Sequence, residues 1–446
     1  MNYDLTSGSI TGKLLRFALP LMIGNILQQF YNIADTFIVG RFIGADALAA
    51  VGSSYTLMTF LTSVLLGLCM GSSAYFAMQF GRRDFDRLRR GIFLSFLLIG
   101  ALTLIVNAAV FLFSRPILRL MRVPSELQEM MLDYLLVIFC GIIATFLYNY
   151  FANLLRAMGN TLTPLIFLGV SSIANIALDL LFVLVIPWGV RGAAIATVIS
   201  QYASGAGIAA YTLLKRPDLR PRRRDMAWDG SILRDISSLS ILTCIQQSVM
   251  NFGILMIQGL VNSFGPAVMS AFAAAVKIDS FAYMPVQDFG NAFSTFVAQN
   301  HGAGQRERIR RGVRSSVLTV FAFCAAISIG VCLLAAPLMR IFVEASRPDI
   351  IAIGAGYLRI EASFYFGIGL LFLLYGYYRA IGRPGMSVVL TVCSLGTRVL
   401  LAYTLSPIPA LGVTAIWAAI PIGWFLADAV GTIRYFQLRK NERPFH

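Results

Sequence analysis

Charged residues are scarce in this chain. Only 13% of its 446 residues are charged, whereas 58% are hydrophobic. A water-soluble protein keeps roughly a quarter of its residues charged, so this sequence has too little polar surface to cover a globule in water. A lipid bilayer is the solvent that removes the conflict. The composition therefore predicts an all-α, polytopic membrane protein.

Histidine is almost absent, and the cysteines do not form motifs. The two histidines are His301 and His446, and all six cysteines lie inside apolar stretches. This spacing is typical of neither a metal site nor a disulfide framework, and we expect no cofactor. A cleavable signal peptide is also missing, because the apolar run 14–39 is too long for one and is expected to be a retained helix.

Long apolar runs are what the sequence has in abundance. A helix that spans a bilayer needs about twenty apolar residues, and twelve segments meet that length. They are 14–39, 47–80, 91–113, 130–155, 162–186, 190–214, 235–262, 267–300, 312–336, 351–379, 385–405 and 411–436. We expect a six-helix bundle over 1–217, a basic cytoplasmic linker over 218–231 and a second six-helix bundle over 232–446.

The distribution of basic residues predicts the orientation. If the N-terminus is cytoplasmic, the cytoplasmic segments hold 26 of the 36 basic residues and the external segments hold seven. Lys and Arg concentrate on the cytoplasmic side of membrane proteins, so both termini are expected in the cytoplasm and the protein in the inner (plasma) membrane. Basic loops that face anionic lipids account for the net charge of +15, and we expect no nucleic-acid partner.

The two halves of the chain repeat one another. The segments SAYFAMQFG at 73–81 and RLRRG at 87–91 align with STFVAQNHG at 294–302 and RIRRG at 308–312, at an offset of 221 residues. Six helices per half is an even number, so both halves enter the membrane in the same orientation. Such a parallel repeat is related by a pseudo-two-fold axis along the membrane normal and is typical of carriers.

A stripe of polar residues runs along the first predicted span. Asp35 lies on one side of this helix together with other polar residues at spacings of three or four. These are Asn25, Gln28, Tyr31 and Asn32. A carboxylate at the middle of a spanning helix costs roughly 2.5–3.5 kcal/mol, so the stripe is predicted to face a wet cavity or another polar helix.

Two later spans add oxygen atoms of the same kind. Asn175 and Asp179 are four residues apart and project from one helical face, and Thr197 lies on the next span. With Asp35 they would form an oxygen-only set that suits Na+, or H+ if one carboxylate is protonated. The alternative is that each carboxylate makes a separate hydrogen bond between packed helices, or that Asp179 lies near the outer rim.

The second half carries its own charged residues inside predicted spans. A salt-bridged structural network and a role in substrate binding or proton relay are both open for them. They are Lys277, Asp279, Asp288, Arg359, Glu361, Arg398 and Asp428.

These motifs together resemble the multidrug and toxic compound extrusion (MATE) family over nearly the whole chain. The resemblance is carried by ALP at 18–20, QQFYNIADTFIVG at 28–40, RAMGN at 156–160 and the matching second half. It implies a two-bundle efflux antiporter of the DinF-like branch. Its cation site would consist of Asp35, Asn175, Asp179 and Thr197. Pro20 matches a proline at which the first helix bends.

One departure from the family concerns the seventh span. Another branch has a carboxylate there as part of a Na+ site in the second bundle, whereas this chain has Gln246, Gln247 and Asn251. We therefore expect ion coupling in the first bundle.

The expected function is export of cationic, amphipathic small molecules by alternating access, in exchange for Na+ or H+. The expected partners are organic cations, the coupling cation and membrane lipids, and the protein is expected to be a monomer. The substrate cavity is predicted to be lined by Gln28, Tyr31, Asn32 and Asn153. The alternatives are a lipid-linked precursor flippase of the same broad superfamily, an integral membrane enzyme and a pure scaffold.

Overall fold

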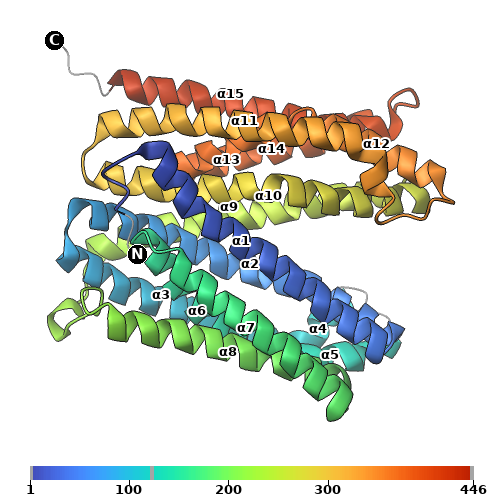
Figure 1. Ribbon diagram of the computed structural model, residues 1–446, viewed down its shortest axis with the longest axis horizontal. Helices are drawn as coiled ribbons and strands as arrows, with labels where there is room; N and C mark the ends of the chain where they lie inside the picture. Colours follow the sequence, from blue (N-terminus) through green and yellow to red (C-terminus); the bar gives the residue numbers. More distant parts are fainter. Residues whose placement is uncertain (1–3, 121–124, 442–446) are drawn as a thin grey trace. The chain divides into compact units, whose positions relative to one another are not determined.

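The protein is built from helices that are long relative to the loops between them. The computed structural model describes residues 4–120 and 125–441, and within these ranges it contains helices and no strands (Figure 1). The helices of the first half are α1 (Ile10–Phe42), α2 (Ala45–Arg82), α3 (Phe85–Leu112), α4 (Ser114–Leu120), α5 (Ser125–Cys140), α6 (Ile142–Ala157), α7 (Leu162–Leu180) and α8 (Gly189–Lys215). A π-helical turn, η1 (Leu181–Val185), follows α7.

The second half follows after a linker that contains one short 3₁₀ turn, η2 (Arg223–Asp225). Its helices are α9 (Gly230–Asn262), α10 (Pro266–Gly302), α11 (Arg306–Met339), α12 (Pro348–Ala362), α13 (Tyr365–Ala380), α14 (Pro384–Leu405) and α15 (Gly412–Asn441).

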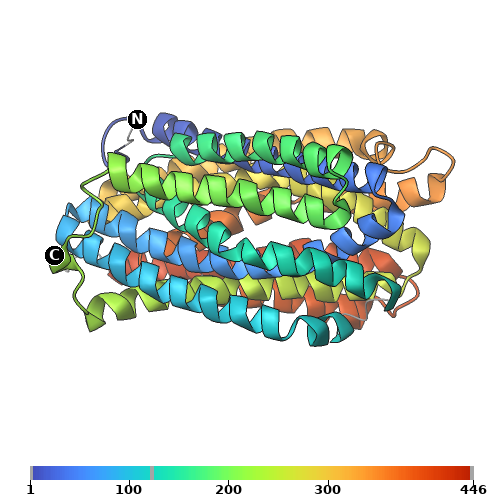
Figure 2. The ribbon, with the colours of Figure 1, turned by 90° about the horizontal axis from the view of Figure 1, so that it is seen from below.

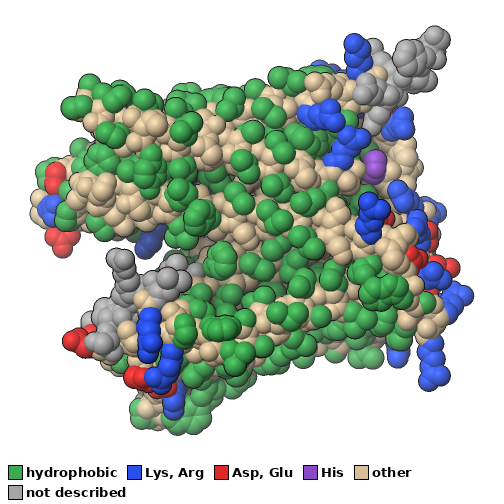
Figure 3. Space-filling view, turned by 180° about the vertical axis from the view of Figure 1, so that it is seen from behind, with side chains coloured by type: hydrophobic (Ala, Val, Ile, Leu, Met, Phe, Trp, Pro, Cys, Tyr) green, Lys and Arg blue, Asp and Glu red, His purple; other side chains and the backbone are tan. Residues whose placement is uncertain are grey.

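These helices match the predicted membrane spans. In the described part of the chain, ten helices are long and apolar enough to cross a bilayer, and two bent pairs bring the number to as many as twelve. The protein is therefore an all-α, multi-pass membrane protein, as predicted. On the face shown in Figure 3, hydrophobic side chains cover most of the surface, while Lys and Arg gather toward its two ends.

Two predicted spans are broken rather than continuous. The span predicted at 130–155 is the pair α5 and α6, which meet at an angle of 43°, and the span predicted at 351–379 is the pair α12 and α13, at 53°. The first break lies at Gly141, whose N–H bonds to the carbonyl of Ile138 at 2.8 Å. Both breaks fall in the fourth span of their half, so they share one position in the repeat.

The chain folds into two compact units whose boundaries lie inside helices. The first unit contains Arg16–Cys244, and the second contains Leu5–Leu15 together with the chain from Ile245 onward. Helix α1 therefore begins in the second unit and continues in the first, and α9 does the reverse. The predicted division into bundles at the linker 218–231 follows the sequence repeat and stays a prediction.

The segment before α1 is held in the second unit by Arg308. The guanidinium group of Arg308 donates hydrogen bonds to the backbone carbonyls of Leu5 (3.2 and 3.1 Å), Ser7 (2.7 Å) and Gly8 (2.8 Å). Leu5 is fully buried, and its N–H donates to the side chain of Gln299 at 3.1 Å. These contacts explain why Leu5–Leu15 belongs to the second unit.

Glycine permits close helix packing within each unit. A Cβ atom at Gly91 would lie 2.5 Å from the ring of Tyr75, and a Cβ atom at Gly312 would lie 2.2 Å from the ring of Phe296. These glycines, and these rings, occupy equivalent positions in the sequence repeat. The duplicated sequence therefore makes the same contact twice.

In the first unit, α7 and α8 lie side by side in both views (Figures 1 and 2). A buried apolar cluster, against which Ile176 of α7 packs, joins α8 and η1 to three further helices. It contains Ile38 and Val39 of α1, Ala47 and Val51 of α2, Tyr134 and Ile138 of α5, Val183 of η1, and Val190, Ala193 and Ala194 of α8. This cluster fixes the helices that carry the predicted cation-site residues.

Candidate cation-coupling site

Helix α1 supplies the first carboxylate of the candidate site. It is a continuous helix from Ile10 to Phe42 and contains Pro20. Asp35 is half-buried, and its Oδ1 atom is buried without a hydrogen-bond partner among the described residues. The bend predicted at Pro20 stays a prediction.

Helix α7 supplies an amide and a second carboxylate in direct contact. Asn175 and Asp179 are 2% and 0% exposed. In the amide orientation that satisfies both ends of Asn175, its Nδ2 donates to Asp179 Oδ2 at 2.9 Å and its Oδ1 accepts from the backbone N–H of Thr197 at 3.2 Å. The spacing of four residues thus brings both side chains to one point, at the last turn of α7 before the π-helical turn.

Helix α8 supplies a hydroxyl group and links the other two helices. Thr197 is 6% exposed, and its hydroxyl donates to the carbonyl of Ala193 at 3.1 Å. The Tyr31 hydroxyl of α1 also contacts the Thr197 side chain. Asp35 and Asp179 lie close enough for their charges to interact. The structure therefore brings together all four residues that the sequence and the resemblance had proposed for cation binding.

Tyr134 is a member of this cluster that the sequence did not indicate. It lies on α5, is 8% exposed and is close enough to Asp35, Tyr31 and Asp179 to interact with them electrostatically. A weak signal was available, because Tyr134 is the only residue with a polar group in the run 134–139. Nothing in that run indicates that it would approach α1 and α7.

The arrangement has the chemistry of a site for a small cation. Two carboxylates and several hydroxyl groups converge, with the amide nitrogen of Asn175 bonded to Asp179. Oδ1 of Asp179, like that of Asp35, is buried without a hydrogen-bond partner among the described residues. Hard oxygen ligands suit Na+, and a proton shared by two neighbouring carboxylates would serve equally well.

The residues predicted to line the substrate cavity lie in different surroundings. Gln28 is exposed, and Tyr31 and Asn32 are half-buried along α1. Asn153 of α6 is 6% exposed and donates to the carbonyl of Asn149 at 2.8 Å, so its amide group is bonded within its own helix. Tyr31 is the one of these residues that reaches the cation cluster. Their role in a substrate cavity stays a prediction.

A second polar cluster lies in the other unit. Asp279 of α10 accepts hydrogen bonds from Tyr365 at 2.7 Å and from Tyr357 at 3.4 Å. Glu361 is fully buried, and neither of its carboxylate oxygens has a partner among the described residues. Both carboxylates interact electrostatically with Arg398 of α14. Asp279, Glu361 and Arg398 are thus neighbours, whereas Lys277 lines a surface pocket elsewhere.

The other charged residues predicted inside spans of the second half lie on α10 (Asp288), α12 (Arg359) and α15 (Asp428). Asp288 and Asp428 are buried, at 3% and 6% exposure. The carbonyl of Arg359 accepts from Ser363 at 2.6 Å, close to the break between α12 and α13.

Comparisons with known proteins agree with this architecture. The MatE family profile matches residues 20–181 and 240–404. The chain is 32% identical to the probable multidrug resistance protein YpnP of Bacillus subtilis (strain 168), over 88% of this chain and 87% of that protein. It is 24% identical to the FAD transporter of Shewanella oneidensis (strain ATCC 700550 / JCM 31522 / CIP 106686 / LMG 19005 / NCIMB 14063 / MR-1), over 94% and 93% of the two chains.

Solved structures share the fold. A MATE family multidrug resistance transporter of the MOP superfamily, in an outward-facing conformation, superposes with a TM-score of 0.92 at 23% identity, over 99% of this chain and 100% of that one. A MOP superfamily transporter from Pyrococcus furiosus, whose binding pocket has reversed polarity, gives 0.89 at 24% identity, over 98% of both chains. By its sequence and its fold, the chain belongs to the MatE family, whose members are membrane transporters and not enzymes.

Proposed function

We propose that the protein is a cation-coupled antiporter that exports cationic, amphipathic small molecules by alternating access. The observation that carries the proposal is the convergence of Asp35, Asn175, Asp179 and Thr197 from three helices. Relatives named as multidrug resistance proteins support the substrate class. The protein would act as a monomer in the inner membrane, with both termini in the cytoplasm and without a cofactor.

The proposed cycle depends on charge neutralisation at the two carboxylates. In the outward-facing state, Na+ or H+ binds at Asp35 and Asp179 and neutralises part of their charge. Helix α1 then changes its packing near Pro20, where the missing backbone N–H removes one helical hydrogen bond. An organic cation held near Gln28, Tyr31 and Asn32 loses affinity and leaves, and the coupling cation continues inward.

The test is transport by purified protein in lipid vesicles. Efflux of a fluorescent organic cation is measured with a Na+ gradient and a pH gradient imposed separately, so that the coupling ion is identified. A flavin nucleotide is assayed in parallel, because one relative is named as an FAD transporter.

Asp35→Asn is expected to abolish gradient-driven efflux while the purified variant elutes and melts like the wild type. The matched control is Asp46→Asn, which alters an exposed carboxylate in the first turn of α2. Full efflux by the Asp35 variant would remove the coupling proposal. Transport of the flavin nucleotide in place of the organic cation would overturn the substrate class.

A further inference from the structure

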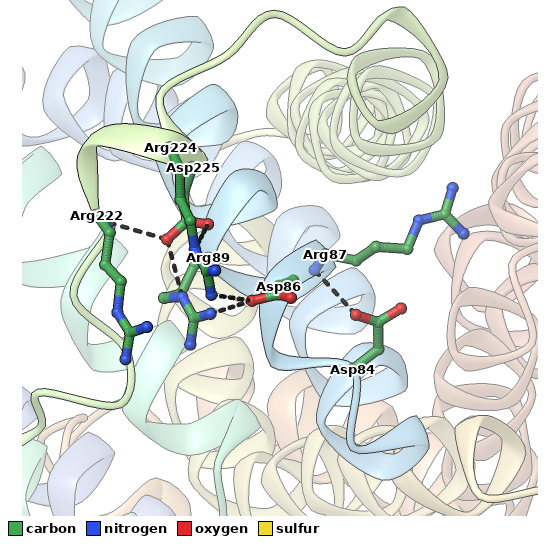
Figure 4. Close-up of polar contacts among 7 residues, drawn as sticks. All are labelled: Asp84, Asp86, Arg87, Arg89, Arg222, Arg224 and Asp225. Carbon is green, nitrogen blue, oxygen red and sulfur yellow. Dashed lines mark hydrogen bonds and ion pairs between the residues drawn. The ribbon is translucent and has the colours of Figure 1, made fainter.

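The linker between α8 and α9 is bound to the start of α3 (Figure 4). Asp225 is 1% exposed and accepts hydrogen bonds from Nε of Arg89 and from the backbone N–H of Arg222, each at 2.9 Å. Arg224 donates to Asp86 at 3.1 Å, and Asp86 also pairs with Arg89. The linker is thus an ordered part of the first unit.

Every acidic residue of the linker is used in these or similar contacts. Burial alone would raise the pKa of Asp225, but the hydrogen bonds from Arg222 and Arg89 hold it below its ordinary value. Asp218 accepts two hydrogen bonds from Arg216, at 2.9 and 2.7 Å. Asp229 accepts from the backbone N–H groups of Ser231 and Ile232 at the start of α9. Each of the three carboxylates of the linker is therefore hydrogen-bonded to a neighbouring group.

Four basic side chains, one at the end of α8 and three in the linker, have no acidic partner among the described residues. Lys215, Arg220, Arg222 and Arg223 are exposed, and in the described part of the chain none of them forms an ion pair. Figure 4 shows the guanidinium group of Arg222 pointing away from Asp225. Four unpaired positive charges within nine residues of chain repel each other, so this segment is complementary to an anionic partner.

Large apolar side chains flank the four basic residues. Leu214 and Trp228 are each 76% exposed, and Met226 is 51% exposed. The linker joins the end of α8 at Lys215 to the start of α9 at Gly230. Both helices are long and apolar enough to span a bilayer, so we expect the linker at the membrane surface. Tryptophan is enriched at this depth, where the ring meets both acyl chains and head groups.

We infer that this surface, which we name the linker patch (Lys215, Arg220, Arg222, Arg223 and Trp228), binds anionic phospholipids of the adjacent membrane leaflet. Arginine side chains donate paired hydrogen bonds to lipid phosphate, and Trp228 lies among the head groups. Clusters of basic residues next to a spanning helix bind anionic lipids in this way. The inference is independent of ion coupling and of the transported substrate.

The alternative is that the basic residues only set the orientation of the helices in the membrane, and it leads to a different prediction. If they served only to orient the helices during insertion, the folded protein would not prefer anionic lipid, and Trp228 would not matter. Any exposed arginine on the same side would then be equivalent. Arg82, Arg306 and Arg314 provide that comparison, because they are exposed and have no ion pair among the described residues.

The experiment uses the full chain purified in detergent and titrated with phosphatidylglycerol or phosphatidylcholine, with bound lipid counted by native mass spectrometry. R220Q/R222Q/R223Q is compared with the matched control R82Q/R306Q/R314Q, which removes the same charge elsewhere. Each patch arginine is expected to contribute about fivefold to phosphatidylglycerol affinity, so the patch variant should lose about a hundredfold. The control should lose much less.

Two further variants keep the test decisive. R220K/R222K/R223K keeps the charge and should retain most of the binding, which guards against misfolding of the glutamine variant. Trp228→Ala should weaken binding of phosphatidylglycerol without changing net charge. Equal losses in the patch and control variants, or no preference for phosphatidylglycerol in the wild type, would overturn the inference. Displacement of the lipid by millimolar inorganic phosphate would mean a soluble anion site instead.

Discussion

Buried carboxylates in the first unit fall into two groups according to their partners. Oδ2 of Asp225 accepts hydrogen bonds from Arg89 and from the backbone N–H of Arg222, whereas Asp35 and Asp179 each keep one buried oxygen without a partner among the described residues. The first arrangement stabilises the fold, and the second leaves capacity for a bound cation. The two groups can be distinguished only by their tertiary contacts, because all three residues are aspartates and the sequence does not show which partners they have.

Asp225→Asn tests the structural group. It should lower the free energy of unfolding by about 1–3 kcal/mol, because Arg89 keeps Asp86 but loses a buried charged acceptor. The lowered pKa of Asp225 means that its contribution is complete above the ordinary aspartate pKa of about 3.9 and is lost as pH falls through the lowered value.

The measurement for Asp225→Asn is thermal melting of purified protein over a series of pH values. The difference from the wild type should be constant near neutrality and should shrink in strong acid, at about pH 3 and below. Asp46→Asn, at an exposed site, should melt like the wild type throughout. A difference for Asp225→Asn that is independent of pH would contradict the assignment of a charged Asp225.

Residue spacing predicted part of the candidate site and missed part of it. Asn175 and Asp179 could be paired from the sequence because four residues make about one helical turn. That Tyr134 approaches Asp35 depends on how α5 packs against α1, which no periodicity within α5 encodes. Asp279, Glu361 and Arg398 come together from three helices. The sequence had named them among seven charged residues of the second half, but their spacing did not single out these three.

At the scale of elements, hydropathy predicted where the spans are but not where they break. The regions 130–155 and 351–379 read as continuous, predominantly apolar runs without proline. At the first break the packing is close instead: a Cβ atom at Gly141 would lie 2.3 Å from Oε1 of Gln201. This contact joins residues about sixty positions apart, so it cannot be predicted from the composition of the span.

Glycine on α2 provides an element-scale test within one helix. A Cβ atom at Gly71 would lie 2.3 Å from the carbonyl oxygen of Leu239 on α9, whereas Gly52 has open space. Gly71→Ala should therefore destabilise the first unit by about 1–3 kcal/mol through overpacking. Gly52→Ala should be neutral or stabilising by up to about 1 kcal/mol, because alanine favours helix. Equal melting temperatures for the two variants would show that α2 and α9 do not pack this closely.

The segment before α1 offers a second element-scale test. Arg308→Gln removes charged donors from the carbonyls of Leu5, Ser7 and Gly8. The substitution should lower the free energy of unfolding by about 2–4 kcal/mol, because hydrogen bonds to charged groups are stronger than those between neutral groups. The control is Arg306→Gln, which alters an exposed arginine two residues away. Protease cleavage near the N-terminus should increase for the Arg308 variant alone; unchanged cleavage would mean that other contacts hold the segment.

At the scale of the whole molecule, the alternation of helices and loops predicts which residues face each side of the membrane. Arg223, in the linker, and Arg347, before α12, should lie on opposite sides if both termini are cytoplasmic. In a cysteine-free background, a membrane-impermeant maleimide added to intact cells should label Arg347→Cys and leave Arg223→Cys unlabelled until the cells are opened. The reverse pattern would invert the proposed orientation.

The attachment of Leu5 to Arg308 also governs the order in which the protein can be completed during synthesis. The two residues are 303 positions apart, so the segment around Leu5 leaves the ribosome long before its binding site exists. The second unit can therefore be completed only after α11 has been made, and it requires residues from near both ends of the chain.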